Sequence, residues 1–353
     1  SYAAVDVVAK KIPHSMFGTI EDAYNAPNSP LKQQCENDPQ AAELITAAKE
    51  LEGIARHAST HAAGVVITDK PAYCYVPLAL NGAAVVTQYT MNYLEELGLL
   101  KIDFLGLRYL TVIHDAVELV RKNKPEFDIN KIPENDPRTY MLISKGDTDG
   151  IFQLESGGMR QLLVDMKPKN LDDLMLAISL YRPGPMKAIP QYLAGRANPK
   201  NIRYLDPKLE NALKETHGVF AYQEQVTQVC RDLAGFSYGQ ADLVRRAMAK
   251  KKQKEMVRQR ERFVHGEKDE NGKVIVPGAV SMGIDEQTAN RIFDDMETFA
   301  GYGFNKCHAA PYALIAYQTA YLRTHQYKEY MAALISSMMG DSKATQYIED
   351  CKR

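Results

Sequence analysis

Within Leu99-Leu-Lys-Ile-Asp-Phe-Leu-Gly-Leu-Arg108 the pattern of the chain changes from strand-like to helical. Before it come short runs rich in β-branched residues, 63–68 and 84–89, with a turn signal at Asn81-Gly82 between them. Together with the start of the quoted stretch, these runs predict the strands of one small sheet. From Leu107 onward the spacing of apolar residues is helical. The sequence therefore predicts a mainly α protein with a small β-sheet portion, in the α+β class.

Helix signals are clear on both sides of this stretch. Residues 38–53 carry apolar residues at spacings of three and four, which predicts an amphipathic helix. Asn170 is placed to cap a helix that Tyr181-Arg-Pro-Gly-Pro185 then stops. Residues 309–335 are apolar nearly all round, which predicts a helix buried in a core. Residues 266–283 predict a hairpin or a mobile insertion.

Composition limits the class of protein. The chain has 353 residues, 45% of them hydrophobic and 25% charged, with a net charge of -1, so we expect two or three globular domains and no uniformly basic surface. Its longest apolar runs fall short of the roughly 18 residues of a membrane span, and no signal peptide is visible. Five scattered cysteines without a Cys-x-x-Cys pair favour a reducing compartment. The chain does not begin with Met, and we expect it to be a fragment of a larger protein.

Lys101 and Asp103 form the first candidate site. Side chains alternate faces along a strand, so these two point the same way, while Ile102 and Phe104 point to the other face. A lysine beside a carboxylate suits a site that handles a metal and a phosphate. A surface ion pair on a sheet is the alternative.

A basic run supplies the second candidate. Half of the positions from 245 to 262 are Lys or Arg, including Arg245, Arg246 and Lys250-Lys-Lys252. Asp242 and Arg246 stand four residues apart and can pair, which leaves Arg245 free. Such a concentration of positive charge attracts phosphates. A solvated helix face is the alternative.

The third candidate is Gly301-Tyr-Gly-Phe-Asn-Lys-Cys-His308. Its glycines let a backbone approach a ligand, Tyr302 and Phe304 offer ring faces, and Lys306 and His308 offer donors for phosphate. A helix end with aromatic residues in the core is the alternative.

Other signals are weaker. His57 and His61 have a spacing that suits zinc, but no third ligand completes the set. Tyr222-Gln-Glu-Gln225 begins an amphipathic helix and by itself predicts no chemistry. The absence of P-loop, GxGxxG and GxSxG motifs weighs against a P-loop NTPase, a dinucleotide enzyme and an α/β-hydrolase.

Seven short motifs, in order along the chain, resemble those of the family C replicative polymerases, the catalytic α subunits of bacterial DNA polymerase III. They are His61-Ala-Ala-Gly-Val-Val66, Leu100-Lys-Ile-Asp-Phe-Leu-Gly-Leu-Arg108, Gly150-Ile-Phe-Gln-Leu-Glu-Ser156, Tyr181-Arg-Pro-Gly-Pro185, Tyr222-Gln-Glu-Gln225, Ala241-Asp-Leu-Val-Arg-Arg-Ala-Met248 and Gly301-Tyr-Gly-Phe-Asn-Lys-Cys-His308. One such motif is short, but seven in the same order are specific.

The resemblance implies three parts: a helical, partial thumb at 1–58, a polymerase-β-like palm segment at 59–108, and the first part of a helical fingers domain at 109–353. It implies that Asp103 is the third of three catalytic aspartates and a ligand of one of two Mg²⁺ ions. The other two aspartates would lie upstream, so we expect the chain alone to be inactive in primer extension.

The resemblance also implies roles for other residues. Lys101 would lie near the reacting phosphates, and the nucleotide would meet the residues Arg245, Arg246, Tyr302, Asn305, Lys306 and His308. Lys250, Lys251 and Lys252 would contact DNA. The implied partners are primer-template DNA, deoxynucleoside triphosphates and other replisome subunits, with the sliding clamp bound through regions outside this chain. The implied location is the bacterial cytoplasm. The alternative is a non-catalytic nucleic-acid-binding protein with a basic helical segment.

Overall fold

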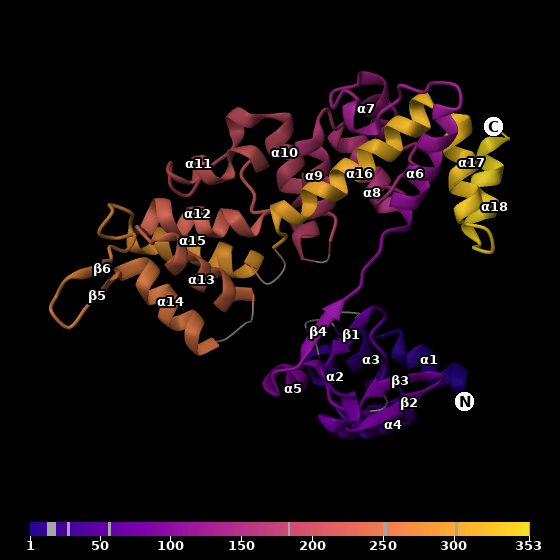
Figure 1. Cartoon of the computed structure of the whole chain (residues 1–353). Coiled ribbons are helices and arrows are strands. Elements are labelled where there is room, and N and C mark those ends of the chain that lie inside the picture. Colours follow the sequence, from indigo (N-terminus) through magenta and orange to yellow (C-terminus); the bar gives the residue numbers. More distant parts are fainter. Residues whose placement is uncertain are drawn as a thin grey trace. The chain divides into compact units, whose positions relative to one another are not determined.

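A computed structural model describes residues 1–12, 19–26, 29–55, 58–182, 184–249, 253–300 and 303–352. The chain forms two compact units, Ser1–Gly106 and Leu107–Arg353, so the boundary lies inside the stretch that separates the two sequence patterns. Helices dominate and the strands are short (Figure 1), which confirms the predicted class. Among the described helices, none combines the length and the apolar character that crossing a membrane requires.

The first unit packs a small core between its helices. The helices are α1 (Tyr2–Ala9), α2 (Ile20–Asn25), α3 (Pro30–Asn37), α4 (Pro39–Leu51) and α5 (Met91–Glu96). The predicted helix over 38–53 is α4, and it begins where the Asp38 carboxylate accepts a hydrogen bond from the Gln40 amide. Buried Val8, Leu31 and Ile45 join α1, α3 and α4 in this core.

The strands of the first unit form two separate two-stranded sheets. Strands β1 (Gly64–Ile67) and β4 (Leu100–Asp103) pair antiparallel, whereas β2 (Leu78–Asn81) and β3 (Ala84–Thr87) form a hairpin of their own. The expectation of one sheet is therefore wrong, and β2 is an additional strand. Alternation within a run predicts a strand but leaves its partner undetermined, because pairing depends on residues outside that strand.

The second unit is almost entirely helical. Its helices are α6 (Arg108–Arg121), α7 (Pro137–Ser144), α8 (Gly157–Met166), α9 (Leu171–Leu180), α10 (Ile189–Ala197), α11 (Leu209–Leu213), α12 (Gln223–Ala234), α13 (Tyr238–Ala249), α14 (Gln253–His265), α15 (Glu286–Ala300), α16 (Lys306–His325), α17 (Tyr327–Ser337) and α18 (Lys343–Cys351). Asn170 caps α9 by accepting from the Asp173 amide, and α9 ends before Tyr181, both as predicted.

Helix α16 runs through the middle of one part of this unit (Figure 1), where it packs on α6, α7, α9 and α17. Ala313, Ala316, Tyr317 and Ala320 are fully buried there, so the prediction of a core helix is confirmed. The prediction of one continuous helix over 309–335 is wrong, because the chain leaves the helical conformation at Gln326 between α16 and α17.

Helices α11 to α15 share a second core, built from residues such as Val229, Phe263 and Phe293. Between α14 and α15, strands β5 (Glu267–Lys268) and β6 (Val274–Val276) pair antiparallel, so the hairpin expected within 266–283 is present. The first turns of α12 and α16 meet beside α13, and this meeting point positions most of the predicted nucleotide-binding residues.

Candidate functional site

Lys101 and Asp103 contact each other on one face of β4. The Lys101 ammonium donates to the Asp103 carboxylate at 2.5 Å, as the alternation of a strand predicts. This hydrogen bond lowers the pKa of Asp103, so the carboxylate stays ionised at neutral pH. The Asp103 side chain is 41% exposed and the Lys101 side chain only 16%, so the carboxylate is accessible to a ligand while the lysine is largely covered.

His61 and Gly64 complete this cluster. The His61 Nδ1 atom accepts hydrogen bonds from the backbone N–H groups of Gly64 and Ala63, at 2.6 and 3.2 Å, and lies 3.7 Å from the Asp103 carboxylate. A Cβ atom on Gly64 would lie 2.7 Å from Lys101 Cε, 2.8 Å from His61 Nδ1 and 2.9 Å from Asp103 Oδ1. A larger residue at position 64 would therefore displace the three side chains that converge there. The zinc spacing with His57 lies outside the described residues.

In the second unit, a backbone bridge joins the start of α12 to the start of α16. Tyr222 and Phe304 form a parallel bridge, in which the Gln223 amide donates to the Phe304 carbonyl at 2.9 Å. The Glu224 carboxylate accepts from the backbone N–H of Lys306 at 3.0 and 3.1 Å. Segments about 80 residues apart in sequence are thus held together at one point.

Arg245 on α13 lies at this junction. Its guanidinium donates to the Gln223 side-chain oxygen at 3.0 Å and to the Asp242 carboxylate at 2.7 and 2.8 Å. Arg246 contacts the other oxygen of Asp242 at 2.6 Å and has a side chain that is 65% exposed. The expectation that Asp242 pairs with Arg246 alone is wrong, because a carboxylate with two oxygens holds both arginines, three and four residues further along the helix.

Lys306 and Asn305 are engaged within the chain. The Lys306 ammonium donates to Glu215 at 2.7 Å and lies 5.3 Å from the centre of the Tyr222 ring. Lys306, Glu215 and Tyr222 line part of a polar cavity of about 380 Å³. Asn305 caps α16, with its side-chain oxygen accepting from the His308 amide at 3.0 Å.

Aromatic contacts continue from this helix start. The His308 ring meets the Phe304 ring edge-on at 5.2 Å and lies 4.7 Å from the Tyr312 ring. The Arg182 guanidinium stacks on Phe304, 3.7 Å from the ring centre. Arg182 belongs to the Tyr181-Arg-Pro-Gly-Pro185 motif, which in the sequence predicts only a helix stop, so its link to this site appears only in the structure.

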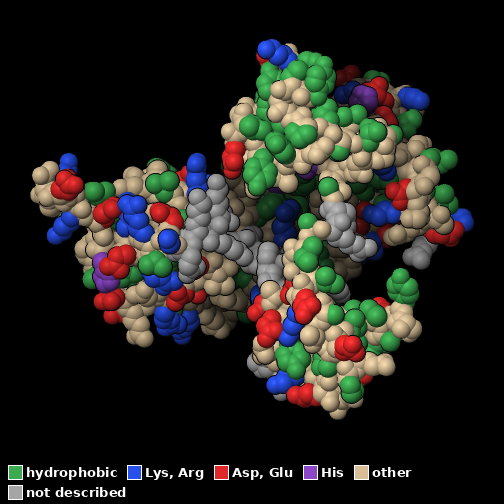
Figure 2. All heavy atoms as spheres, turned by 90° about the horizontal axis from the view of Figure 1, so that it is seen from below, with side chains coloured by type: hydrophobic (Ala, Val, Ile, Leu, Met, Phe, Trp, Pro, Cys, Tyr) green, Lys and Arg blue, Asp and Glu red, His purple; other side chains and the backbone are tan. Residues whose placement is uncertain are grey.

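The basic run is more balanced than its sequence indicates. Arg258 and Arg262 pair with Glu267, and Arg260 pairs with Asp294 and Glu297. Figure 2 shows blue and red side chains interspersed over the part of the second unit that ends in the β5–β6 hairpin. The predicted residues Tyr302, Lys250, Lys251 and Lys252 lie outside the described residues.

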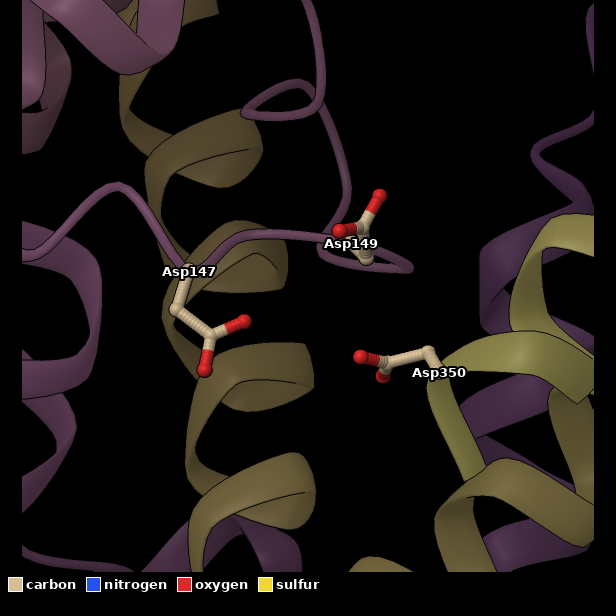
Figure 3. A group of neighbouring side chains, drawn as sticks. All are labelled: Asp147, Asp149 and Asp350. Atoms are coloured by element: carbon tan, nitrogen blue, oxygen red, sulfur yellow. The ribbon is translucent and has the colours of Figure 1, made fainter. Parts of the chain in front are cut away.

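An acidic cluster gathers around Arg323 on α16, and it contains none of the residues predicted as site residues. Asp147, Asp149 and Asp350 converge in Figure 3. The buried Arg323 guanidinium lies between two of them, donating to Asp147 at 2.8 Å and to Asp350 at 2.9 Å, while Arg160 pairs with Asp149. Two arginines already pair with these three carboxylates, which favours an ion-pair network around the buried Arg323 over a metal site.

Family models match both units. A model described as the bacterial DNA polymerase III alpha NTPase domain matches residues 1–106, and one described as the bacterial DNA polymerase III alpha subunit finger domain matches residues 109–271. The chain belongs to the bacterial DNA polymerase III alpha subunit family. Lys101, Asp103 and Gly64 lie in the first match, and Gln223, Arg245 and Arg246 lie in the second.

Individual alpha subunits are similar along nearly the whole chain. The DNA polymerase III subunit alpha of Borreliella burgdorferi is 43% identical over 99% of this chain and 30% of its own length. Those of Thermus aquaticus and Staphylococcus aureus are 46% and 41% identical, over 91% and 98% of this chain and 26% and 31% of theirs. The chain therefore spans about a third or less of the alpha subunits that it matches.

Proposed function

We propose that this chain is part of the catalytic subunit of a bacterial replicative DNA polymerase, which adds deoxynucleotides to a primer 3′ end under the direction of a template. The observation that carries the proposal is the 43% identity to an alpha subunit over 99% of the chain. The partners that follow are primer-template DNA, deoxynucleoside triphosphates and other replisome subunits, including a sliding clamp bound through regions outside this chain.

Asp103 is the proposed metal-binding residue of this chain. One of its oxygens contacts Lys101, and the side chain is exposed enough for the carboxylate to bind a divalent cation such as Mg²⁺. One carboxylate does not make a complete site, and the only group of three or more potential ligands among the described residues is the network around Arg323. Asp103 fits one ligand of a larger site, and we expect the chain alone not to extend a primer. In that site Mg²⁺ would neutralise phosphate charge.

Lys101 is proposed to hold positive charge beside the reacting phosphates. Its ammonium is already fixed on Asp103, so it needs little further ordering when a phosphate arrives. The proposed triphosphate contacts are Arg245, Arg246, Asn305, Lys306 and His308, with Tyr302 as a ring face. Arg245 on α13 contacts Gln223 at the start of α12, and Asn305 and Lys306 stand at the start of α16, which is bonded to the start of α12. This proximity supports a common ligand.

Replacing Asp103 in the full-length subunit tests the proposal. We expect Asp103→Asn to fold normally and to lose nearly all primer extension with Mg²⁺, because one metal ligand and one negative charge disappear together. Asp115→Asn makes the same chemical change on an exposed position of α6 and should keep wild-type activity. Primer extension and circular dichroism are measured for both variants.

Two outcomes would contradict the proposal in different ways. Substantial synthesis by Asp103→Asn would show that Asp103 is not a metal ligand. A wild-type full-length subunit that binds DNA but never extends a primer would favour the alternative, a non-catalytic nucleic-acid-binding protein.

A further inference from the structure

The side chain of Gln223 bridges two parts of the proposed nucleotide site. We infer that Gln223 is a positioning residue, which holds Arg245 at a fixed place relative to residues 303–305. The inference rests on the proposed function, since it gives a role to Gln223 through Arg245. Gln223 makes no proposed contact with the nucleotide itself.

Both polar atoms of the Gln223 amide are used. Its oxygen accepts from the Arg245 guanidinium at 3.0 Å, and its nitrogen donates to the Gly303 carbonyl at 2.9 Å. The orientation of the amide is therefore fixed, because the flipped amide would place two donors, or two acceptors, face to face. A glutamate at position 223 could accept from the Arg245 guanidinium but could not donate to the Gly303 carbonyl.

After its contacts with Gln223 and Asp242, Arg245 keeps N–H donors that can bind an anion. A guanidinium has five N–H groups, and the contacts of Arg245 use one on Nε, one on Nη2 and one on Nη1. Among the described residues, one N–H on each terminal nitrogen has no partner. Two such donors can bind two oxygens of one phosphate. Asp242 fixes one side of the guanidinium and Gln223 fixes the other.

The backbone supports this arrangement. The Gln223 amide donates to the Phe304 carbonyl at 2.9 Å, so both the main chain and the side chain of one residue hold residues 303–304. A Cβ atom on Gly303 would lie 2.6 Å from the Phe299 ring and 3.3 Å from Gln223 Cγ, so the approach depends on glycine. Gln223 thus connects α13, α12 and the segment that leads into α16.

The test is a double-mutant cycle in the full-length subunit with Gln223→Met, Arg245→Ala and the combined variant. Gln223→Met keeps the length of the side chain and removes both hydrogen bonds. We expect it to raise the KM for deoxynucleotide about tenfold, as the loss of a hydrogen bond to a charged group predicts, with a smaller change in kcat and unchanged DNA affinity. In the Arg245→Ala background, Gln223→Met should raise KM no further, because the residue through which it acts is gone.

Gln228→Met is the matched control, since Gln228 lies on the same helix and bonds only with its neighbours Arg231 and Asp232 among the described residues. It should leave KM unchanged, and the urea midpoint of Gln223→Met should equal that of this control. Gln223→Glu should also raise KM, because it loses the bond to Gly303.

The outcomes separate the two proposals. If Arg245→Ala keeps a wild-type KM, the nucleotide role of Arg245 is wrong and the role of Gln223 falls with it. If Arg245→Ala is defective while Gln223→Met is normal, or if the two defects add in full, only the positioning role is wrong.

Discussion

At the scale of single residues, Gly64 is a position where adding one methyl group should disturb the proposed metal-binding cluster. Any Cβ atom there meets Lys101, His61 and Asp103 at distances below 3.0 Å. These atoms belong to side chains that can move, so we expect Gly64→Ala to lower the free energy of unfolding by only about 1 kcal/mol, the lower end for overpacking. Because Asp103 must shift, primer extension by the full-length subunit should fall at least about tenfold, the effect of a misplaced reacting group.

Gly157→Ala serves as the control, because nothing among the described residues lies within 4 Å of a Cβ atom at Gly157. It should keep both stability and activity. Urea denaturation and primer extension are compared for the two variants. Wild-type synthesis by Gly64→Ala would show that the packing of this cluster does not matter for catalysis.

At the scale of elements, the cap of α16 has two separable roles. Asn305 accepts from the His308 amide, and its loss should cost about 1 kcal/mol in unfolding free energy, as for other helix caps. Asn170→Ala removes the equivalent cap of α9 and should cost a similar amount. Only Asn305→Ala should also raise the KM for deoxynucleotide. If both variants change stability alone, Asn305 is a cap without a nucleotide role.

At the scale of the whole molecule, Arg323 connects parts of the second unit that are far apart in sequence. Its side chain is 4% exposed, and it joins Asp147, which follows α7, to Asp350 on α18. Arg323→Met should lower the free energy of unfolding by about 3 kcal/mol, because Asp147 and Asp350, the latter only 17% exposed, lose the buried arginine that pairs with them. This value is the lower end of the usual range, since Asp147 is half exposed and can be rehydrated.

Urea denaturation of the chain measures this effect. Adding Asp147→Asn and Asp350→Asn to Arg323→Met should recover part of the stability, because the uncompensated charges are removed. Millimolar Mg²⁺ should leave the midpoint of thermal unfolding of the wild-type chain unchanged. A clear rise in that midpoint would indicate a metal site instead.

Binding of the full-length subunit to DNA is also a property of the whole molecule. Replacing Lys250, Lys251 and Lys252 together in the full-length subunit should weaken DNA binding regardless of sequence. It should flatten the slope of log affinity against log salt by about 0.9 for each duplex phosphate that the protein no longer neutralises. Three exposed lysines elsewhere in the second unit, Lys122, Lys145 and Lys200, provide the control set. If the triple lysine variant keeps the salt dependence of the wild-type subunit, the alternative holds, in which the basic run is a solvated helix face.

Local signals in the sequence were enough for several features that have a local cause. Asn170 predicts the start of α9 because a cap bonds within its own first turn. Alternation along β4 places Lys101 beside Asp103 because both belong to one strand. The seven motifs predicted the family, and the match to alpha subunits confirms it.

Contacts between residues that are far apart in the sequence became visible only in the folded chain. Gln223 reaches Arg245 across 22 positions and Gly303 across 80 positions. Arg323 binds Asp147 across 176 positions. The positions of charged side chains and the ends of many helices follow from the sequence, because helix ends depend on neighbours along the chain. The sequence does not show which distant residue a side chain bonds to. That partner depends on how the helices and strands pack against one another, and this packing leaves no periodic pattern in the sequence.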